Sequence, residues 1–241
     1  MSKALCLIPA KGLSVRLPRK NMLPLNGKPL VVNIIEKAIK SLQFDEIIVS
    51  TEDDEIANIS NITGASVPFL RPELLSKDPS TLIDVMLHAL EFYQKNGVQF
   101  DSICVLLPTS PFVSIQDIIE AKKIFDKSSK YSVMSVCPTE FPPFNSWVIN
   151  EKNGIEQLQA CFPNSKYKFT KSTECPKTFR SNGAILITQV DSLLKHRTYR
   201  VNSILPYVMP SERSLDIDTY FDYELAKFIV STPIENIKSK R

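Results

Sequence analysis

Short apolar runs alternate with amphipathic segments along residues 1–137 of the chain. The runs are rich in Val, Ile and Leu, which is typical of strands buried on both faces of a parallel sheet. They cover residues 4–8, 46–50, 66–70, 102–107 and 132–137. The segments between them predict helices near 29–41, 53–62, 80–96 and 114–128. This alternation predicts an α/β fold with an open, mostly parallel sheet that binds its ligands at the carboxyl ends of the strands.

The alternation stops after residue 137. Residues 138–180 are rich in Pro, Asn, Lys and aromatic residues and show no long helical pattern, so we interpret them as an insertion with short hairpins. The α/β core returns over 181–232, with a strand at 184–188, a helix near 189–196, an apolar run at 204–209, a short strand through Ile217 and a helix near 219–231. Residues 233–241 are expected to form a frayed tail.

Composition narrows the class of protein. The chain has 241 residues, enough to bury a core without disulfides or metals, and its net charge of +3 is too small and too dispersed for a nucleic-acid binder. Its five cysteines form no C-x-x-C pair, which favours reduced thiols in the cytoplasm. No run approaches the ~18 apolar residues of a membrane span. We therefore expect a soluble cytoplasmic protein.

A basic loop follows the first apolar run. It reads PAKGLSVRLPRKN over residues 9–21 and brings Lys11, Arg16 and Lys20 around Gly12 and Ser14. Gly12 allows a tight turn, and backbone amides together with cationic side chains can hold a polyphosphate. Neither G-x-x-x-x-G-K-[ST] nor G-x-G-x-x-G is present. The loop could also be an ordinary solvated surface loop, but its place after the first strand favours a ligand site.

Two aspartates near the C-terminus form the second candidate site. If residues 215–218 are extended, Asp216 and Asp218 project from one face while Ile217 points into the core. Paired carboxylates suit Mg²⁺, which commonly takes one or two carboxylates together with substrate phosphates. Alternatively, Asp218 could be the N-cap of the next helix, although capping would not explain Asp216. Combined with the basic loop, the pair suggests metal-assisted nucleotide chemistry.

These segments together resemble the CMP-sialic acid synthetases (acylneuraminate cytidylyltransferases) and their pseudaminic and legionaminic acid relatives. The matching segments are IPAKGLSVRLPRKN, LNGKPLV, IIVSTEDDEIA, LRPELLSKD, LPTSPF, FRSNGAILI and RSLDIDT, in family order over nearly the whole chain. The resemblance implies a Rossmann-like α/β fold and a homodimer whose insertion exchanges contacts between subunits. It also implies transfer of CMP from CTP to the anomeric hydroxyl of a nonulosonic (sialic-type) acid, with Mg²⁺ or Mn²⁺ assisting the departure of pyrophosphate.

The resemblance also implies residue roles. Lys20 and Arg16, with Lys11 as a further candidate, would hold the β- and γ-phosphates. Asn21 would contact the nucleotide and Arg71 the cytosine. The resemblance makes Asp216 and Asp218 the metal ligands, one of which would also help to deprotonate the sugar hydroxyl. The catalytic set is Lys20, Asp216 and Asp218. Arg180 would reach the sugar site across the dimer.

The sequence departs from the family pattern mainly on the sugar side. Lys11 replaces an arginine and Leu13 a glycine of the loop, and Leu82 replaces a serine near the base. Leu107 stands where a glutamine usually precedes PTSP, and Asn145 where a lysine is thought to meet the sugar carboxylate. A cytidylyltransferase for the eight-carbon acid KDO, or a nucleotide-binding relative without catalysis, are the alternative interpretations.

Overall fold

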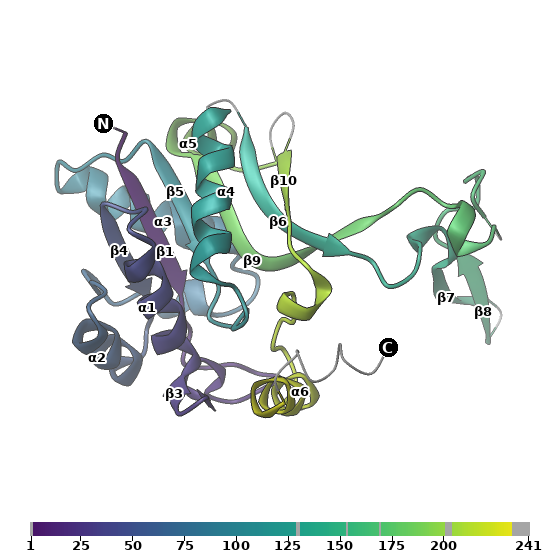
Figure 1. The fold of residues 1–241 in the computed structure, drawn as a ribbon, viewed down its shortest axis with the longest axis horizontal. Helices are drawn as coiled ribbons and strands as arrows, with labels where there is room; N and C mark the ends of the chain where they lie inside the picture. Colours follow the sequence, from purple (N-terminus) through teal and green to yellow (C-terminus); the bar gives the residue numbers. More distant parts are fainter. Residues whose placement is uncertain (1, 129–130, 153, 169, 201–203, 233–241) are drawn as a thin grey trace.

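The computed structural model describes residues 2–128, 131–152, 154–168, 170–200 and 204–232. Within them a six-stranded sheet has the order β10-β6-β9-β5-β1-β4 (Figure 1). The strands are β1 (Ala4–Pro9), β4 (Glu46–Ser50), β5 (Ser102–Leu106), β6 (Ser132–Pro138), β9 (Phe179–Gln189) and β10 (Ile204–Val208). All neighbours pair parallel except β9, which runs antiparallel to both β5 and β6. The expected open, mostly parallel sheet is confirmed.

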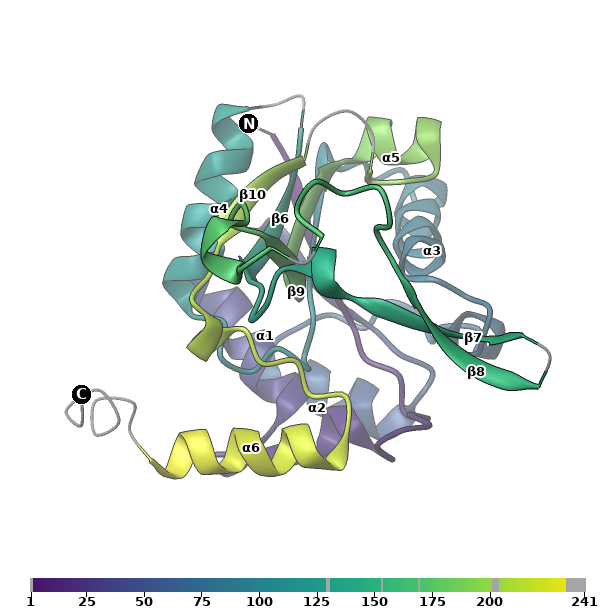
Figure 2. The same ribbon diagram turned by 90° about the vertical axis from the view of Figure 1, so that its right-hand side faces the viewer.

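Helices cover both faces of the sheet because alternate strand residues point to opposite sides. Cys6 and Ile8 of β1 pack with α1 and α4, whereas Leu5 and Leu7 pack with α3 and α5. Figure 2 shows α4 on one side of the sheet and α3 and α5 on the other. The helices are α1 (Leu30–Ser41), α2 (Asp54–Thr63), α3 (Leu82–Lys95), α4 (Ile115–Lys127), α5 (Val190–His196) and α6 (Tyr220–Ser231). None of the helices in the described part of the chain could span a membrane.

Two predicted strands are wrong. Residues 66–70 pair with the sheet only through isolated bridges at Ser66 and Leu70, since Pro68 between them has no N–H to donate to a ladder. Residues 214–218 also form no strand. Ile217 is nevertheless fully buried, as expected, and its N–H donates to the carbonyl of Thr109 at 2.8 Å. This hydrogen bond ties the segment to the chain that follows β5.

The segment between β6 and β9 leaves the body of the molecule. It contains a hairpin of β7 (Trp147–Lys152) and β8 (Ile155–Ala160), which Figure 1 shows at the far end from the helices. We call residues 139–178 the arm. The short strands β2 (Pro24–Leu25) and β3 (Lys28–Pro29) form a second small ribbon beside α6. The predicted tail, 233–241, lies outside the described residues, and a dimerisation role for the insertion stays a prediction.

Candidate active site

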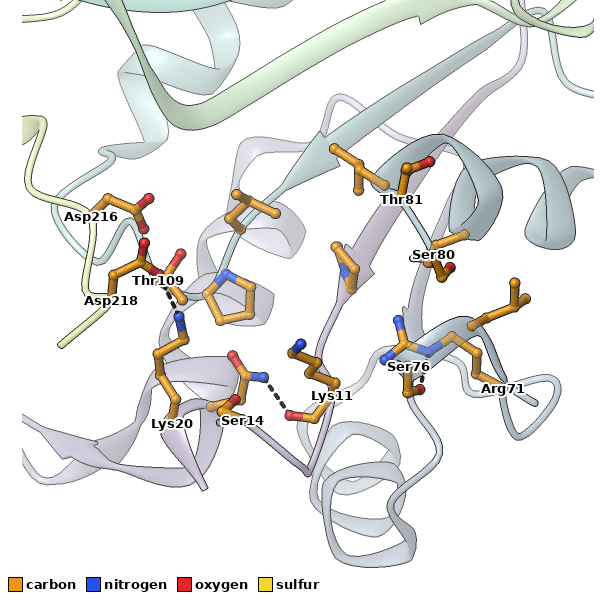
Figure 3. Close-up of a pocket in the computed structure, with 17 residues that line it drawn as sticks. Lys11, Ser14, Lys20, Arg71, Ser76, Ser80, Thr81, Thr109, Asp216 and Asp218 are labelled. Atoms are coloured by element: carbon orange, nitrogen blue, oxygen red, sulfur yellow. Dashed lines mark hydrogen bonds and ion pairs between the residues drawn. The ribbon is translucent and has the colours of Figure 1, made fainter. Parts of the chain in front are cut away.

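A pocket of about 260 Å³ opens at the carboxyl end of the sheet (Figure 3). It lies where ligands of open α/β sheets bind. Residues from four distant segments line it: the basic loop, the segment before α3, the end of β5 and the segment before α6. The predicted site residues among them are Lys11, Ser14, Lys20, Asn21, Arg71, Leu107, Asp216 and Asp218. Leu82, one of the departures, lines the pocket too. The fold therefore brings the two candidate sites of the sequence together.

The loop between β4 and α2 packs against the basic loop. Asp53 lies so close to Gly12 that a Cβ at this position would come within 2.4 Å of Asp53 Oδ2, so only glycine fits. The same carboxylate accepts a hydrogen bond from Arg19 at 2.5 Å. Asn21 is buried, and its Nδ2 donates to the carbonyl of Lys11 at 2.8 Å, which closes the loop. The loop is thus a built structure and not a freely solvated surface segment.

Asp218 faces the basic loop. Its carboxylate is paired with Lys20 Nζ at 2.9 Å and with Arg16 Nη2 at 2.8 Å. Burial would raise the pKa of Asp218, but these two cations outweigh it and lower the pKa. The alternative in which Asp218 caps the last helix is wrong, because Thr219 is the N-cap of α6 and forms a capping box with Asp222. Asp218 is therefore available to the pocket.

Asp216 has a different environment. Burial raises its pKa, the charge of Asp218 adds to this rise, and a hydrogen bond from Thr109 opposes it. Its Oδ1 is buried and has no hydrogen-bond partner among the described residues. An unpaired buried carboxylate oxygen is costly unless a ligand completes it.

Two further buried polar atoms in the same pocket lack a partner among the described residues, Ser14 Oγ and Ser80 Oγ. Together with Asp216 Oδ1 they come from three separate segments and border one space. Native proteins leave few such atoms unsatisfied. Their concentration here indicates that a polar ligand supplies the missing hydrogen bonds.

The opposite wall of the pocket contains Arg71, which Figure 3 shows beside Ser76. Arg71 is buried, and its Nη2 donates to Glu52 Oε2 at 2.9 Å while its Nε donates to Ser76 Oγ at 3.0 Å. Burial would raise the pKa of Glu52, but hydrogen bonds from Ser76 and Arg71 outweigh it and lower the pKa. Glu52 is thus an ionised carboxylate that holds the arginine in place.

Four predicted site residues do not line this pocket. Gly12 is buried beneath the loop, and Arg16 lines an adjoining depression of about 350 Å³ that shares Lys11, Lys20 and Asp218 with the pocket. Asn145 lies on the arm, in a short 3₁₀ turn. Arg180 lies at the root of the arm on β9, where its Nη2 approaches the carbonyl of Ser214 at 3.5 Å.

The sequence interpretation overlooked Glu52, Ser76 and Thr109. Glu52 and Thr109 lie two and three residues after the ends of β4 and β5, so their place after a buried strand was the signal that could have found them. Ser76 carries no such signal, since it belongs to a 3₁₀ turn between β4 and α3.

The two aspartates are the residues that could hold a divalent cation. The described residues contain no cluster of three or more His, Cys, Asp or Glu side chains suited to a metal. Two hard carboxylates, one with an unsatisfied buried oxygen, fit Mg²⁺ or Mn²⁺ that takes its other ligands from phosphate and water. The pocket thus combines a basic loop, a carboxylate pair and a buried arginine.

The chain is similar to known cytidylyltransferases in sequence and in fold. A sequence model described as cytidylyltransferase matches residues 5–207. The pseudaminic acid cytidylyltransferase of Campylobacter jejuni is 31% identical over 94% of this chain and 96% of its own length. The CMP-N,N'-diacetyllegionaminic acid synthase of Legionella pneumophila is 34% identical over 93% of this chain and 95% of its own. The N-acylneuraminate cytidylyltransferase of Escherichia coli is 34% identical over 93% of this chain, which spans about half (51%) of that relative.

Among solved structures, CMP:2-keto-3-deoxy-manno-octonic acid synthetase complexed with CTP has a TM-score of 0.70. The match covers 95% of this chain and 99% of that one at 16% identity. At this identity the similarity concerns the fold alone.

Proposed function

The chain belongs to the cytidylyltransferase family, and we propose that it transfers CMP from CTP to the anomeric hydroxyl of a nonulosonic acid. The observation that carries this proposal is the pocket in which the basic loop faces Asp216 and Asp218. The resemblance of the sequence supplies the sugar class, and the full-length relatives named above support it.

The charged groups around the pocket suit the transfer of CMP from CTP, in which negative charge moves onto pyrophosphate. The sugar oxygen forms a bond to the α-phosphorus of CTP, the bond from that phosphorus to the bridging oxygen breaks, and pyrophosphate leaves with the electron pair. Lys20, Arg16 and Lys11 neutralise the charge that grows on pyrophosphate. The proton of the attacking hydroxyl passes to one carboxylate of the pair Asp216 and Asp218.

Asp216 and Asp218 are the residues that we propose hold Mg²⁺ or Mn²⁺. When bound, the ion would supply Lewis-acid stabilisation of the phosphate oxygens. The unpartnered Oδ1 of Asp216 supports this assignment.

We also propose that the enzyme is a cytoplasmic homodimer joined through the arm. Large apolar side chains are exposed there on a segment that makes no large core of its own: Phe141, Trp147, Val148, Ile149, Ile155, Leu158 and Phe162. Exposed apolar surface of this kind is typical of interaction sites. Since Asn145 cannot supply a positive charge, we propose that Arg180 or a lysine of the arm meets the sugar carboxylate.

The test is an assay of pyrophosphate release with CTP, Mg²⁺ and a panel of N-acetylneuraminic, legionaminic, pseudaminic and KDO acids. We expect turnover and a CMP-sugar product, identified by mass, with at least one nine-carbon acid, and loss of turnover with EDTA. Turnover with KDO alone would make the eight-carbon alternative correct. CTP binding without turnover on any acid would identify a non-catalytic relative.

A further inference from the structure

Glu52 occupies a position between the two walls of the pocket. It lies two residues after the end of β4, and only 9% of its side chain is exposed. Its Oε1 accepts hydrogen bonds from the backbone N–H of Gly12 at 2.8 Å and of Leu13 at 3.4 Å. Its Oε2 accepts from Arg71 Nη2 at 2.9 Å and from Ser76 Oγ at 2.7 Å. Glu52 therefore accepts hydrogen bonds from the basic loop with one oxygen and from the opposite wall, formed by Arg71 and Ser76, with the other. We call these two residues the arginine wall.

The four donors place Glu52 behind the pocket. Arg71 and Ser76 line the pocket, as do Lys11 and Ser14 on either side of the two bonded amides, whereas Glu52 itself does not. A ligand that touches both walls therefore meets them at a separation that this side chain sets. The ionised state strengthens all four hydrogen bonds, since bonds to a charged acceptor are stronger than neutral ones.

Arg71 is immobilised by the same contacts. Ser76 accepts from its Nε and in turn donates to Glu52, so arginine, serine and glutamate form a closed triangle of hydrogen bonds. A guanidinium group can only donate hydrogen bonds. Fixed in this way, it favours a nucleobase edge made of acceptors, such as O2 and N3 of cytosine, over the edge of uracil, where N3–H is a donor.

We propose that Glu52 is a positioning residue for nucleotide selection, which holds Arg71 at a fixed distance from the basic loop so that the pocket accepts cytosine and rejects uracil. The inference rests on the proposed function, because it assumes that CTP binds across these two walls. It assigns to Glu52 a role through Arg71 and not a contact with the substrate. The neighbouring Asp53 acts differently, since it binds Arg19 and packs against Gly12 without reaching the arginine wall.

The test compares CTP with UTP in the wild type and in Glu52→Gln. Glutamine has the size of glutamate but only one acceptor oxygen, which cannot accept from the basic loop and from Arg71 at once. Its amide NH₂ would face one of these two sets of donors and make no hydrogen bond with it. Loss of one charged hydrogen bond predicts a fall of about 10- to 100-fold in the ratio of kcat/KM for CTP over UTP. The KM for CTP should rise by a similar factor, while kcat at saturating CTP and the KM for the sugar change little, because the phosphate and metal groups remain.

Ser76→Ala provides a second variant in case Glu52→Gln folds poorly. It keeps the link from Glu52 to the loop but opens the triangle at Arg71, and should lower the CTP/UTP ratio in the same direction. Glu73→Gln is the matched control, because Glu73 is an exposed carboxylate two residues from Arg71 that pairs with Lys77 at 2.7 Å. Its ratio should equal that of the wild type.

The outcomes separate the two proposals. A wild-type protein that neither binds nor uses CTP contradicts the proposed function itself. A wild type that selects CTP, with an unchanged CTP/UTP ratio in both Glu52→Gln and Ser76→Ala, overturns the role of Glu52. A variant that is merely less stable lowers the rate for both nucleotides equally and leaves the ratio unchanged, which also counts against the inference.

Discussion

At the scale of residues, the two aspartates of the pocket differ although they are two positions apart. Burial raises the pKa of Asp216, whereas Lys20 and Arg16 hold the pKa of Asp218 below its usual range. Carboxylates whose environments move their pKa values in opposite directions commonly divide the work of a site. We therefore expect the two carboxylates to have different roles, with Asp218 acting through a charge that Lys20 and Arg16 keep in place.

Replacement of Asp218 by asparagine tests this division. Asp218→Asn keeps the shape and removes the charge, so turnover at saturating CTP should fall by about 100- to 1,000-fold. The thermal midpoint should change little, because partly exposed ion pairs contribute at most about 1 kcal/mol. Glu212→Gln, an exposed carboxylate on the same segment, is the control for the lost charge. Near-normal turnover of Asp218→Asn would remove this residue from the site.

Leu107 bears on the choice of sugar. It lines the pocket, and its Cδ1 would lie 3.3 Å from a Cβ at Gly183, so it forms an apolar wall where the family usually has a glutamine. An apolar wall favours a methyl or deoxy position and discriminates weakly against a missing polar group. We expect kcat/KM to be higher for 9-deoxy, diacylated acids of the legionaminic or pseudaminic type than for N-acetylneuraminate, by roughly 10- to 200-fold.

A reciprocal variant makes the sugar prediction sharper. Leu107→Gln restores the polar group and should move the ratio of the two sugars toward N-acetylneuraminate, measured in side-by-side kinetics at saturating CTP. Equal use of both sugars by the wild type, or no change of the ratio in the variant, would show that another residue selects the sugar.

At the scale of elements, Asp117 ties three elements together near the pocket. It lies in the first turn of α4 and is buried, and it accepts hydrogen bonds from Ser114 within α4 and from Tyr207 of β10 at 2.8 Å. It also binds Arg213 Nη2 at 2.7 Å, just before the segment of Asp216 and Asp218. Burial would raise the pKa of Asp117, but hydrogen bonds from Arg213, Ser114 and Tyr207 outweigh it and lower the pKa.

This lowered pKa fixes the sign of a pH effect. The folded state holds the charged form of Asp117 more strongly than the unfolded state, so its contribution is complete above the ordinary aspartate pKa of about 3.9. The contribution is lost as the pH falls through the lower pKa of the folded state. Asp117→Asn should therefore reduce the free energy of unfolding by about 3 kcal/mol at neutral pH, toward the lower end for a broken buried pair because Arg213 is partly exposed.

Urea unfolding of both proteins between pH 7 and pH 3 measures this effect. The difference in stability should be constant near neutrality and should shrink below about pH 4. Asp126→Asn, at the exposed end of the same helix, should change stability by less than about 0.5 kcal/mol. A difference that does not depend on pH would show that the packing of Asp117, and not its charge, provides the stabilisation.

Local patterns predicted most elements of this fold, and what they missed has both local and non-local causes. Val32 and Ile35 recur at helical spacing and lie on the buried side of α1, as the pattern required. The antiparallel placement of β9 depends on pairing such as that of Leu186 with Val105, which no local pattern encodes. Residues 66–70 have the apolar character of a strand, but the missing N–H of Pro68 prevents a ladder.

The site shows the same limit. Lys20 and Asp216 could be proposed from residue type and from their position next to buried runs. Glu52 also lies close behind a buried run, but its role could not be proposed, because that role depends on distances to Gly12, 40 residues away, and to Arg71, 19 residues away. Hydrogen-bonded side chains that connect separate segments become visible only once the chain is folded.

At the scale of the whole molecule, the arm exposes apolar side chains on a hairpin far from the core (Figure 1). Ile149 and Leu158 lie opposite each other across β7 and β8 and are 66% and 65% exposed. Such a pair would be costly to leave in water on a long-lived monomer. The proposed dimer therefore depends on this face of the hairpin.

The double variant Ile149→Asp with Leu158→Asp should produce monomers in light scattering. The thermal unfolding of the α/β body should be unchanged, since neither side chain belongs to its core. Asn150→Asp with Gln157→Glu adds the same two charges to the opposite face of the hairpin and should remain dimeric. A wild type that is monomeric at micromolar concentration and fully active would contradict the proposed assembly.

The ion pairs of Asp218 with Lys20 and Arg16 also have a thermodynamic consequence. In the free protein these groups already neutralise one another, so binding of the proposed metal–nucleotide complex would be an exchange of partners. A cation on Asp218 would displace two protein cations, and the triphosphate that receives them would free the carboxylate. Neither exchange is complete without the other. From the proposed function we therefore expect metal and nucleotide to bind with positive coupling, and by linkage each would increase the affinity for the other by the same factor.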